Sequence, residues 1–304
     1  MWFKNLLLYR FPGKVDIDQN TLNQQLQEQA FKPCGKQDTH RYGWVPPMGD
    51  LSDQLFHSAN GCLMFCARRE EKVLPAAVIR EKLEEKVAHI QATEDRRVYR
   101  KEQQSLKDDI VFECLPQAFT KSQRTYAYID TQTGWLVVDA SSAAKAEELM
   151  KLLRQSLGTL PVVPAQVAES PAVIMSGWLR GEQLPSGVEP GDECELREAG
   201  EDGSILRCKR QDLYASEIEQ HLNGGKQVVK LAIDWQETLQ CILSEDLSIK
   251  RLKFADKLLE EANDASDGDK AAQFDADFVV MSLNLREFIE VVVNFFGGLA
   301  REAQ

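Results

Sequence analysis

The stretch that decides the fold follows Pro75 and reads AAVIREKLEEKVAHIQATEDRRVYRKEQQSLKDDIVFECL, residues 76–115, without a single glycine or proline. Apolar residues keep helical spacing at both of its ends, whereas the middle, 91–105, is almost wholly polar. One helix of about 40 residues would be about 60 Å long at 1.5 Å per residue, and two helices joined near 91–95 are the alternative. Because its middle has too little apolar surface to pack on both sides, we predict a long helical segment, about 76–119, that projects from the body.

A sheet is predicted on both sides of this segment. Residues 61–67 form an apolar run typical of a buried strand, and 124–130 with 134–139 have the spacing of a β-hairpin. The chain also begins with an apolar segment, residues 2–9, that suits a buried strand. Helices are predicted from Asp18 onward and over 143–157, where Gly158 ends the second helix.

The rest of the chain predicts shorter, alternating elements. The stretch 161–191 is richer in proline and glycine and is the expected boundary between an N-terminal half, 1–165, and a C-terminal half, 166–304. The predicted fold class is therefore α+β, with mixed sheets. Strands are expected at 193–198, 204–210, 227–234, 238–243 and 248–254, helices at 214–222 and 284–296, and an acidic mobile loop at 260–273.

Composition limits the class of protein. Of 304 residues, 43% are hydrophobic, and 36 basic against 48 acidic residues leave a net charge of −12. These values exclude collagen-like, wholly disordered and wholly basic nucleic-acid-coating proteins, although they allow local basic surfaces. Seven scattered cysteines argue against a secreted disulfide framework. Because no run approaches the roughly 18 apolar residues of a membrane helix, we expect a cytoplasmic protein without a membrane partner.

No motif in the sequence demands an enzyme. The sequence lacks a nucleophile elbow and a phosphate-binding loop. Cys62 and Cys66 have no second ligand pair nearby and are expected as core residues on one face of a strand. The acid pairs Asp108–Asp109 and Asp275–Asp277 could hold Mg²⁺ in a nuclease, whereas solvated or helix-capping acids are the commoner explanation. We predict no catalytic residue, no metal and no cofactor.

Basic residues of the helical segment form a stripe. At about 100° per residue, six of them fall on one face of a continuous helix, a face about 100° wide, with acidic residues opposite. Such segregation in an acidic protein favours a surface for a polyanion. The alternative is a solvated helix with ion pairs between successive turns. The six residues of the stripe are Lys82, Lys86, Arg96, Arg97, Arg100 and Lys107.

Two further basic clusters lie in the second half. The segments 207–211 and 250–253 alternate basic with apolar residues as strands do, and Lys226 and Lys230 lie between them. No zinc-finger, helix-turn-helix or RNA-binding aromatic motif accompanies these charges. The pattern therefore indicates contact with a phosphate backbone and not the recognition of a base sequence.

Several segments are similar to those of one family from one end of the chain to the other. They are WFKNL (2–6), GWVPPMG (43–49), ARREEKVLP (67–75), LPQAF (115–119), SLGTLPV (156–162), RCKRQDL (207–213), GKQVVKLAIDW (225–235), KRLKF (250–254) and FDADF (274–278). Together they resemble RdgC, the recombination-associated proteins of proteobacteria. None of these segments is a catalytic signature.

The resemblance implies a nucleoid-associated, non-enzymatic protein that binds DNA without sequence preference. It implies a horseshoe-shaped monomer that closes into a ring-shaped homodimer, with a basic hole that encircles duplex DNA; single-stranded DNA is a further candidate ligand. It also implies antagonism of the bacterial recombinase, through limits on filament formation and strand exchange. An acidic exterior with a basic lining would reconcile the net charge with DNA binding.

The resemblance also assigns roles to single residues. Phe119 matches the aromatic residue at one ring contact, the gate, whereas from sequence alone it would be a core residue at a helix end. Arg210 and Gln211 match a pair at the opposite ring contact that also serves DNA binding, and Lys226 matches a cation that faces the hole. Gln117 departs from the family, in which arginine is frequent at this position. Two alternatives stay open: a regulator that binds the recombinase directly with little DNA contact, and a metal-dependent nuclease built on Asp275 and Asp277.

Overall fold

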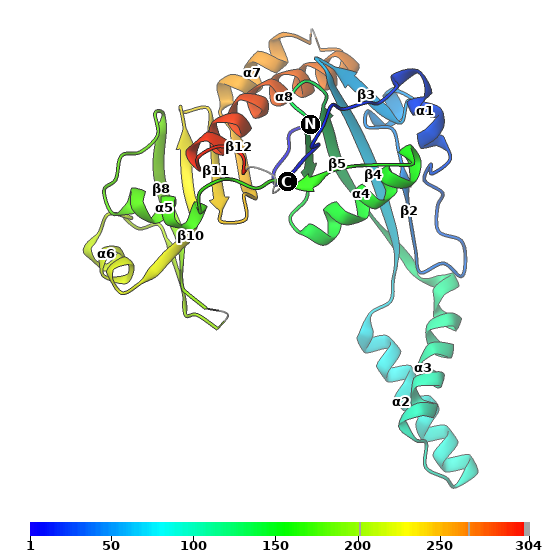
Figure 1. Ribbon diagram of the computed structural model, residues 1–304. Helices are drawn as coiled ribbons and strands as arrows, with labels where there is room; N and C mark the ends of the chain where they lie inside the picture. Colours follow the sequence, from blue (N-terminus) through cyan, green and yellow to red (C-terminus); the bar gives the residue numbers. More distant parts are fainter. Residues whose placement is uncertain (201, 267, 301–304) are drawn as a thin grey trace.

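The structure, a computed structural model, describes residues 1–200, 202–266 and 268–300 and has an α+β fold built on one large sheet (Figure 1). Ten strands follow the order β2-β4-β5-β6-β1-β12-β11-β10-β8-β9, and β3 and β7 pair at the side with β4 and β1. The strands are β1 (Leu6–Arg10), β2 (His40–Trp44), β3 (Phe56–Ala59), β4 (Cys62–Val73), β5 (Phe119–Asp130), β6 (Trp135–Asp139), β7 (Val163–Pro164), β8 (Val188–Glu198), β9 (Ile205–Lys209), β10 (Lys226–Trp235), β11 (Leu239–Ser244) and β12 (Ile249–Phe254).

Eight α-helices accompany the sheet over the described ranges. They are α1 (Gln19–Gln27), α2 (Ala76–Glu94), α3 (Arg100–Cys114), α4 (Ala143–Leu157), α5 (Pro171–Leu179), α6 (Ser216–Asn223), α7 (Asp256–Asp264) and α8 (Lys270–Phe295). None of the helices in the described part of the chain is long and apolar enough to span a membrane.

The expectation of mixed sheets was wrong. Every pairing between the named strands is antiparallel. The reason is that tight turns join β3 to β4, β5 to β6 and β10 to β11, and a tight turn can connect only antiparallel neighbours. The sheet also runs through the pairing of β1 with β12, where Leu6 lies opposite Ile249, so strands from both halves of the chain share one sheet. The boundary near residue 165 stays a prediction.

The N-terminal strands are covered on both faces. Along β4, Leu63 and Phe65 pack in the cluster that contains α1 and α4, whereas Cys62 and Met64 pack in the cluster that contains α8. Side chains alternate between the two faces of a strand, and here helices cover both faces. This explains why the run at 61–67 is apolar at every position and not only at alternate ones.

Helix α8 joins the two ends of the sheet. Its 26 residues span about 39 Å at 1.5 Å per residue. Near its start Phe278 lies against Tyr128 of β5, and further along Phe288 lies 5.2 Å from the ring of Trp235 in β10. Arg286 anchors it between these points, because its Nε donates to Oδ2 of the buried Asp130 over 2.6 Å.

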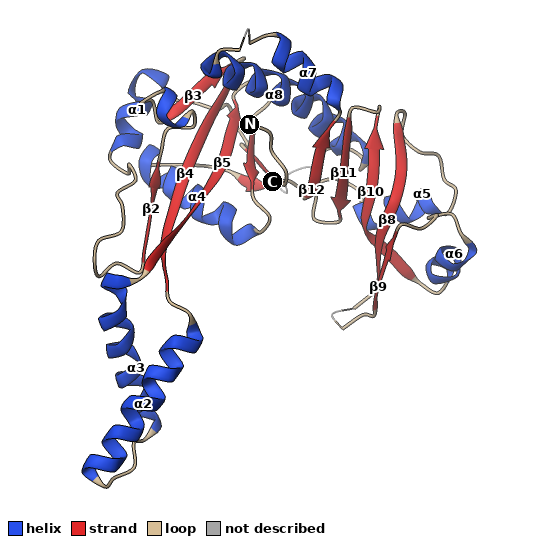
Figure 2. Cartoon of the chain, turned by 180° about the vertical axis from the view of Figure 1, so that it is seen from behind, coloured by secondary structure: helices blue, strands red, loops and turns tan. Residues whose placement is uncertain are grey.

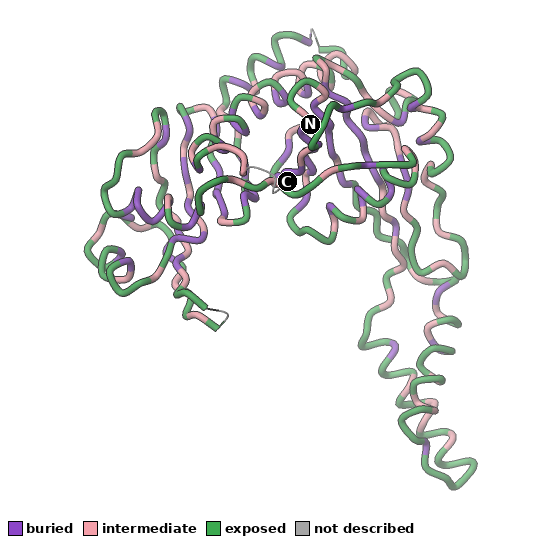
Figure 3. Tube along the Cα trace, in the orientation of Figure 1, coloured by how far each residue is buried: buried purple, intermediate pink, exposed green. Residues whose placement is uncertain are grey.

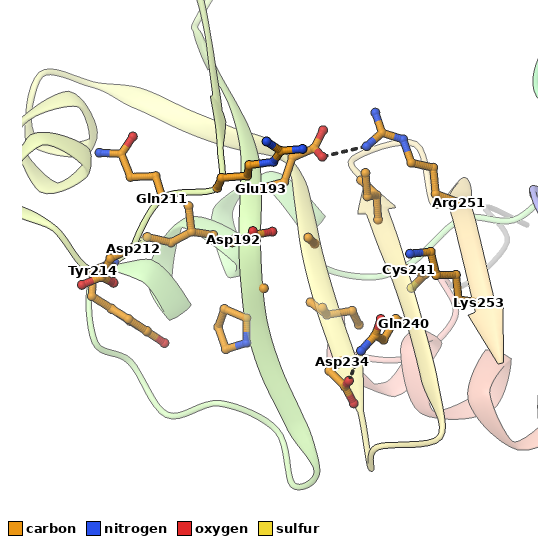
Figure 4. A pocket seen from close by; sticks show the side chains of 17 residues that line it. Asp192, Glu193, Gln211, Asp212, Tyr214, Asp234, Gln240, Cys241, Arg251 and Lys253 are labelled. Carbon is orange, nitrogen blue, oxygen red and sulfur yellow. Dashed lines mark hydrogen bonds and ion pairs between the residues drawn. The ribbon is translucent and has the colours of Figure 1, made fainter. Parts of the chain in front are cut away.

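The C-terminal strands are covered on one face only. Residues of α5, α6 and α8 pack with alternate side chains of β8 to β12 in one core cluster, to which Trp178, Leu222 and Phe288 contribute large side chains. The opposite face carries charged side chains, and Figure 4 views it with the helices behind the strands. We call this surface the basic sheet face and define it by Arg207, Lys209, Lys230, Lys250, Arg251 and Lys253 with the acids Glu193 and Glu195.

The segment 76–115 forms two helices and projects from the sheet, as predicted (Figures 1 and 2). Of the two alternatives, two joined helices are confirmed: α2 ends at Glu94, Asp95 takes a left-handed conformation with φ +48°, and α3 begins at Arg100. The chain reverses there, and the helices form an antiparallel hairpin. Figure 3 shows most of this hairpin as exposed or half-buried, in contrast to the strands of the body.

Two sequence expectations need correction. The acidic segment 260–273 is helical over most of its length, because α7 extends to Asp264 and α8 begins at Lys270, and the buried Leu258 and Ala262 give α7 an apolar face. The boundary segment 161–191 contains α5, whose side chains are buried on almost all sides. Its apolar residues therefore show no helical period. The other predicted strands and helices are present, but β4, β5 and β8 are longer than predicted by five or six residues, and α8 begins fourteen residues earlier.

Candidate nucleic-acid interface

The predicted stripe does not lie on one face. Lys82 and Lys86 are on α2, Arg96 and Arg97 lie in the connection, and Arg100 and Lys107 are on α3. The prediction of a single face assumed one continuous helix, and the reversal at Asp95 removes that continuity. The assumption was therefore wrong, whereas a DNA-binding role for each of these residues stays a prediction.

Contacts within the hairpin show how the two helices are turned. Lys86 Nζ lies 3.3 Å from Glu113 Oε1 across the hairpin, so these residues share a flank. Lys107 is six positions before Glu113, which places it about 120° around α3 from that flank at about 100° per residue. The basic residues of α2 and those of α3 therefore face different sides.

Ion pairs neutralise part of the stripe. The guanidinium of Arg96 donates to both carboxylate oxygens of Glu102, over 2.8 and 2.7 Å, and to Glu94 over 2.5 Å. These hydrogen bonds, above all those that Arg96 donates to Glu102, raise the pKa of Arg96 above its ordinary value. Among the described residues, four members of the stripe have no ion-pair partner: Lys82, Arg97, Arg100 and Lys107.

The basic sheet face gathers six cations, and two carboxylates hold four of them in place. Glu195 lies opposite both Arg207 and Lys230 in the neighbouring strands and binds them over 2.8 and 2.9 Å. Glu193 binds Arg251 over 2.7 Å and Lys209 over 3.4 Å. Directly opposed charges of opposite sign stabilise an antiparallel pair. Each carboxylate thus holds two cations in fixed positions, and Figure 4 shows the contact between Glu193 and Arg251.

The electrostatics of this face remain positive. Partial burial raises the pKa values of Glu193 and Glu195, but hydrogen bonds from Arg251 and Lys209 to the first, and from Arg207 and Lys230 to the second, outweigh it and leave both pKa values lowered. Both carboxylates are therefore ionised at neutral pH. With Arg210, Asp192, Asp212 and Asp234, which line the adjoining hollow, the surface has seven cations against five carboxylates, a net charge of +2. A cation that shares its carboxylate with another keeps N–H groups for further acceptors such as phosphate oxygens.

A hollow of about 780 Å³ lies beside this network (Figure 4). Arg251 and Lys253 line one side of it, and Gln211 and Tyr214 line the other. The small residues Gly191 and Ala232 form its floor, where a Cβ at position 191 would lie 3.0 Å from that of Ala232. Small side chains therefore keep the surface open at this point.

Of the three C-terminal site residues predicted from the sequence, the structure places Arg210 and Gln211 at the edge of this region. Arg210 follows β9 with φ +54° and lines the hollow, with no ion-pair partner among the described residues. Gln211 also lines it, and its Nε2 donates to Glu217 Oε2 over 2.8 Å. Lys226 lies apart: its ammonium contacts Ser204, lies 3.8 Å from Glu198, and its side chain is only 16% exposed.

Phe119 is not a core residue. It begins β5 directly opposite Val73 and is 87% exposed, the most exposed large apolar residue in the described part of the chain. Val73 beside it is 43% exposed. Gln117, which departs from the family, is exposed nearby in a short 3-10 turn, Leu115–Gln117. The base of the hairpin therefore presents an apolar surface to the solvent.

The residues weighed for chemistry have structural partners. Burial raises the pKa of the Cys62 thiol to about 11 and that of Cys66 to about 12, so both are neutral core residues, as predicted. Asp275 accepts from His57 over 2.9 Å, and Asp277 binds the amine of Met1. The last two carboxylates are two positions apart on α8, about 200° around the helix, and therefore diverge.

The sequence patterns did not single out Glu193 and Glu195, the two carboxylates that hold cations of the sheet face. Glu193 and Glu195 stand in strict alternation with the buried Cys194 and Leu196, which is the signal that could have placed them on the same face as the cations. In the described ranges, no three histidine, cysteine, aspartate or glutamate side chains are placed to hold a metal ion.

Comparison with known proteins identifies the family of the chain. Residues 1–299 match the family described as "RdgC: Putative exonuclease, RdgC". The recombination-associated protein RdgC of Yersinia enterocolitica is 44% identical over 301 residues, which cover 99% of each chain. The protein of the same name from Yersinia pestis strain Pestoides F is 43% identical over the same length. The chain therefore belongs to the RdgC family.

Proposed function

We propose that this protein binds DNA through its phosphate backbone, without sequence preference, and that it acts in recombination as a non-enzymatic antagonist of the recombinase. The observation that carries the proposal is the basic sheet face, which together with the adjoining hollow has a net charge of +2 in a chain of net charge −12. Local concentration of one sign of charge attracts a polyanion even when the whole protein has the opposite sign. The recombination-associated names of the relatives support the setting.

Phosphate contact is favoured over base recognition by the geometry of this face. Four of its six cations are held on the strands by Glu193 and Glu195, so these four form a fixed array. Contacts to phosphate oxygens position a protein on DNA but carry no base identity. The expected ligand is therefore duplex DNA of any sequence.

We further propose that two copies close into a ring around the duplex. The two regions with DNA-binding candidates, the hairpin and the strands β8 to β12, lie on opposite sides of the molecule in Figure 2. A horseshoe of this kind needs contacts at both ends to close. The exposed Phe119 and Val73 at the base of the hairpin suit one contact, and the region of Arg210 and Gln211 suits the other. Truncation of a buried interface aromatic typically costs about 2 kcal/mol or more.

Equilibrium binding to duplex DNA at several salt concentrations, without recombinase, tests the DNA-binding part. The log–log slope should be about −0.9 for each phosphate neutralised on B-DNA, and a scrambled sequence should change little. A flat salt response, or strong preference for one sequence, would contradict phosphate contact. Mg²⁺-dependent cleavage of the same DNA would contradict the non-enzymatic assignment.

Encirclement is tested separately by retention on DNA. A closed ring should slide off linear DNA faster than off a circle of the same sequence, and blocking the ends of the linear DNA should remove the difference. Equal release from both forms would contradict the ring. Recombinase filament assays with a variant that no longer binds DNA complete the test, because inhibition by that variant would indicate direct binding to the recombinase.

A further inference from the structure

Two cysteines lie opposite one another beneath the basic sheet face. Cys194 of β8 and Cys208 of β9 are direct partners in the antiparallel register. Both side chains are buried in the core cluster, on the other side of the strands from Glu193 and Glu195. Directly opposed residues of an antiparallel pair have Cα atoms about 4.5–5.5 Å apart, and a disulfide requires about 4.4–6.8 Å. The backbone spacing therefore allows a bond between the two sulfur atoms.

The two side chains also point toward one another. Burial, together with the charge of Cys208 and a hydrogen bond to it, raises the pKa of the Cys194 thiol to about 12. A hydrogen bond between two thiols requires adjacent sulfur atoms. Both cysteines are free in this structure, which therefore holds the reduced form of the pair.

This arrangement is specific to one pair of cysteines in the described strands. Each of the other cysteines on strands has a different residue type opposite: Asp130 and Ala59 beside Cys62, Tyr126 beside Cys66, and Ile233 beside Cys241. Burial alone therefore does not single out Cys194 and Cys208. Their direct opposition does.

The pair lies where a crosslink would fix a strand. β9 has five residues, ends the sheet, and among the described residues pairs only with β8. Arg207 and Lys209 flank Cys208 on this strand. A slip of one residue in the pairing would turn both cations from the basic sheet face to the core. A bond between Cys194 and Cys208 would hold the register that keeps these cations on the charged face.

We propose that Cys194 and Cys208 form a reversible disulfide when the protein meets hydrogen peroxide, and that this bond clamps β9 to β8. The inference is independent of the proposed DNA binding. Cys208 reacts first, because an end strand opens more readily than a strand inside the sheet.

The chemistry proceeds in two steps. The thiolate of Cys208 attacks one peroxide oxygen, the O–O bond breaks, and a sulfenic acid and one water form. The sulfur of Cys194 then attacks the sulfur of the sulfenic acid, its proton leaves with the hydroxyl group as a second water, and the S–S bond forms. Two thiols are thereby oxidised, and one peroxide is reduced to two waters. A dithiol reductant reverses the reaction by thiol–disulfide exchange and is itself oxidised to a disulfide.

Mass spectrometry of the full chain after treatment with hydrogen peroxide tests the proposal. The mass should fall by about 2 Da, because the two thiols lose two hydrogen atoms. Trypsin digestion without reductant should give a product that links residues 181–197 to residues 208–209, and dithiothreitol should remove it. This measurement uses the wild-type protein and does not depend on the folding of a variant.

Hydrogen exchange tests the clamp. The disulfide closes a loop over residues 194–208 and so removes chain entropy from the opened state. For a loop of about 15 residues this corresponds to about a hundredfold in the opening equilibrium. The amides of β9 should therefore exchange up to about a hundredfold more slowly after oxidation, and dithiothreitol should restore the original rates.

A matched control is available on the same sheet. Cys241 is also buried but lies opposite Ile233, so Cys241→Ala should leave the crosslink unchanged, whereas Cys208→Ala should abolish it. An unchanged mass after peroxide treatment would overturn the inference. Addition of oxygen to Cys194 or Cys208 without a crosslink, or a disulfide between other cysteines, would also overturn it. Unchanged exchange of the β9 amides in the crosslinked protein would overturn the clamp.

Discussion

The hairpin and the basic sheet face both gather cations that local sequence patterns had singled out, yet only the sheet brings its cations together. On the hairpin, the predicted face splits because α2 and α3 run in opposite directions. On the sheet, Arg207 and Lys230 come from separate strands and meet at Glu195. The difference shows that the periodicity of the sequence correctly predicts which side chains share a face within one helix or strand. Between elements, the arrangement depends on how the chain turns and pairs.

The two regions also differ in how they are supported. The sheet face lies on strands whose other side is buried against α5, α6 and α8, whereas the hairpin has few buried side chains (Figure 3). Charges on the first are therefore held by the core of the protein, and those on the second mainly by their neighbours in the hairpin. Five predictions test this comparison, from the largest expected effect to the smallest.

The largest effect is expected at the attachment of α8. Arg286→Ala leaves Asp130, which is 2% exposed, without its ion-pair partner. Loss of one partner of a buried pair costs about 3–5 kcal/mol, so the free energy of unfolding should fall by that amount in denaturant titrations. The double variant Arg286→Met with Asp130→Asn should recover a large part of the loss. If Arg286→Ala unfolds like the wild-type protein, this ion pair does not anchor α8 to the sheet.

The second largest effect concerns DNA binding by the sheet face. The triple variant Arg207→Ala, Arg251→Ala and Lys253→Ala should lower affinity for duplex DNA a few hundredfold near 0.1 M salt, because about 0.9 is lost from the log–log slope for each of three phosphates. The loss should be the same on scrambled DNA. Circular dichroism and sedimentation check that fold and self-association persist. Normal affinity of this variant would remove the observation on which the proposed function rests.

The hairpin should contribute less to duplex binding. The double variant Arg97→Ala and Arg100→Ala should lower affinity about fiftyfold at the same salt and shrink the slope by about 1.8. Since both residues are exposed, the free energy of unfolding should change by no more than about 0.5 kcal/mol. If this variant binds DNA as tightly as the wild-type protein, Arg97 and Arg100 are solvated residues without a role in DNA binding.

Self-association tests the base of the hairpin. Phe119→Ser should weaken the dimer by about 2 kcal/mol, as truncation of an interface aromatic does, and should speed release from linear DNA. The thermal unfolding of the monomer should hardly change, because the side chain is 87% exposed. Phe112→Ser, also exposed on α3, is the matched control. A large fall in unfolding temperature with normal dimerisation would show that Phe119 supports the fold and not the ring.

The smallest effect is a gain in affinity for duplex DNA, not a loss. The pair Glu193→Gln and Glu195→Gln should strengthen duplex binding, roughly threefold for each carboxylate removed at low salt, because two negative charges leave a surface that faces phosphates. Glu290→Gln, on the exposed side of α8, is the control. Weaker binding would mean that the carboxylates matter more for positioning the cations than for the net charge of the face.

Acidity gives an independent check on the same residues. The pKa values of Glu193 and Glu195 are lowered in the folded protein, so both stay ionised as the pH falls from 7 to 5. Over this range, the wild-type protein should not acquire the tighter binding of the glutamine variants through protonation of these groups. For the same reason, the stability that these ion pairs contribute is present at neutral pH and is lost only as the pH falls through the lowered pKa values.

Several features of the site could be predicted from the sequence because they are local. Alternation along the strands placed Arg207, Lys209 and Lys253 on one type of face, and the helical spacing with a polar middle over 76–115 predicted a projecting helical segment. The exposed state of Phe119 could not be derived in this way. A phenylalanine after a helix is more often buried, and only the family resemblance favoured a contact surface.

What the sequence by itself determined is the periodicity of each element, the α+β class and the membership of the RdgC family, since all of these depend on residues close together in the chain or on end-to-end similarity. Only the tertiary structure decided that the hairpin reverses at Asp95, that α8 spans both ends of the sheet, and that α5 covers one face of β8 to β12 and leaves the other to the cations. The physical reason is that a strand's alternation specifies two faces without stating which one is covered. That choice is made by packing against segments distant in the sequence, which bury the apolar face and leave the charged one in water.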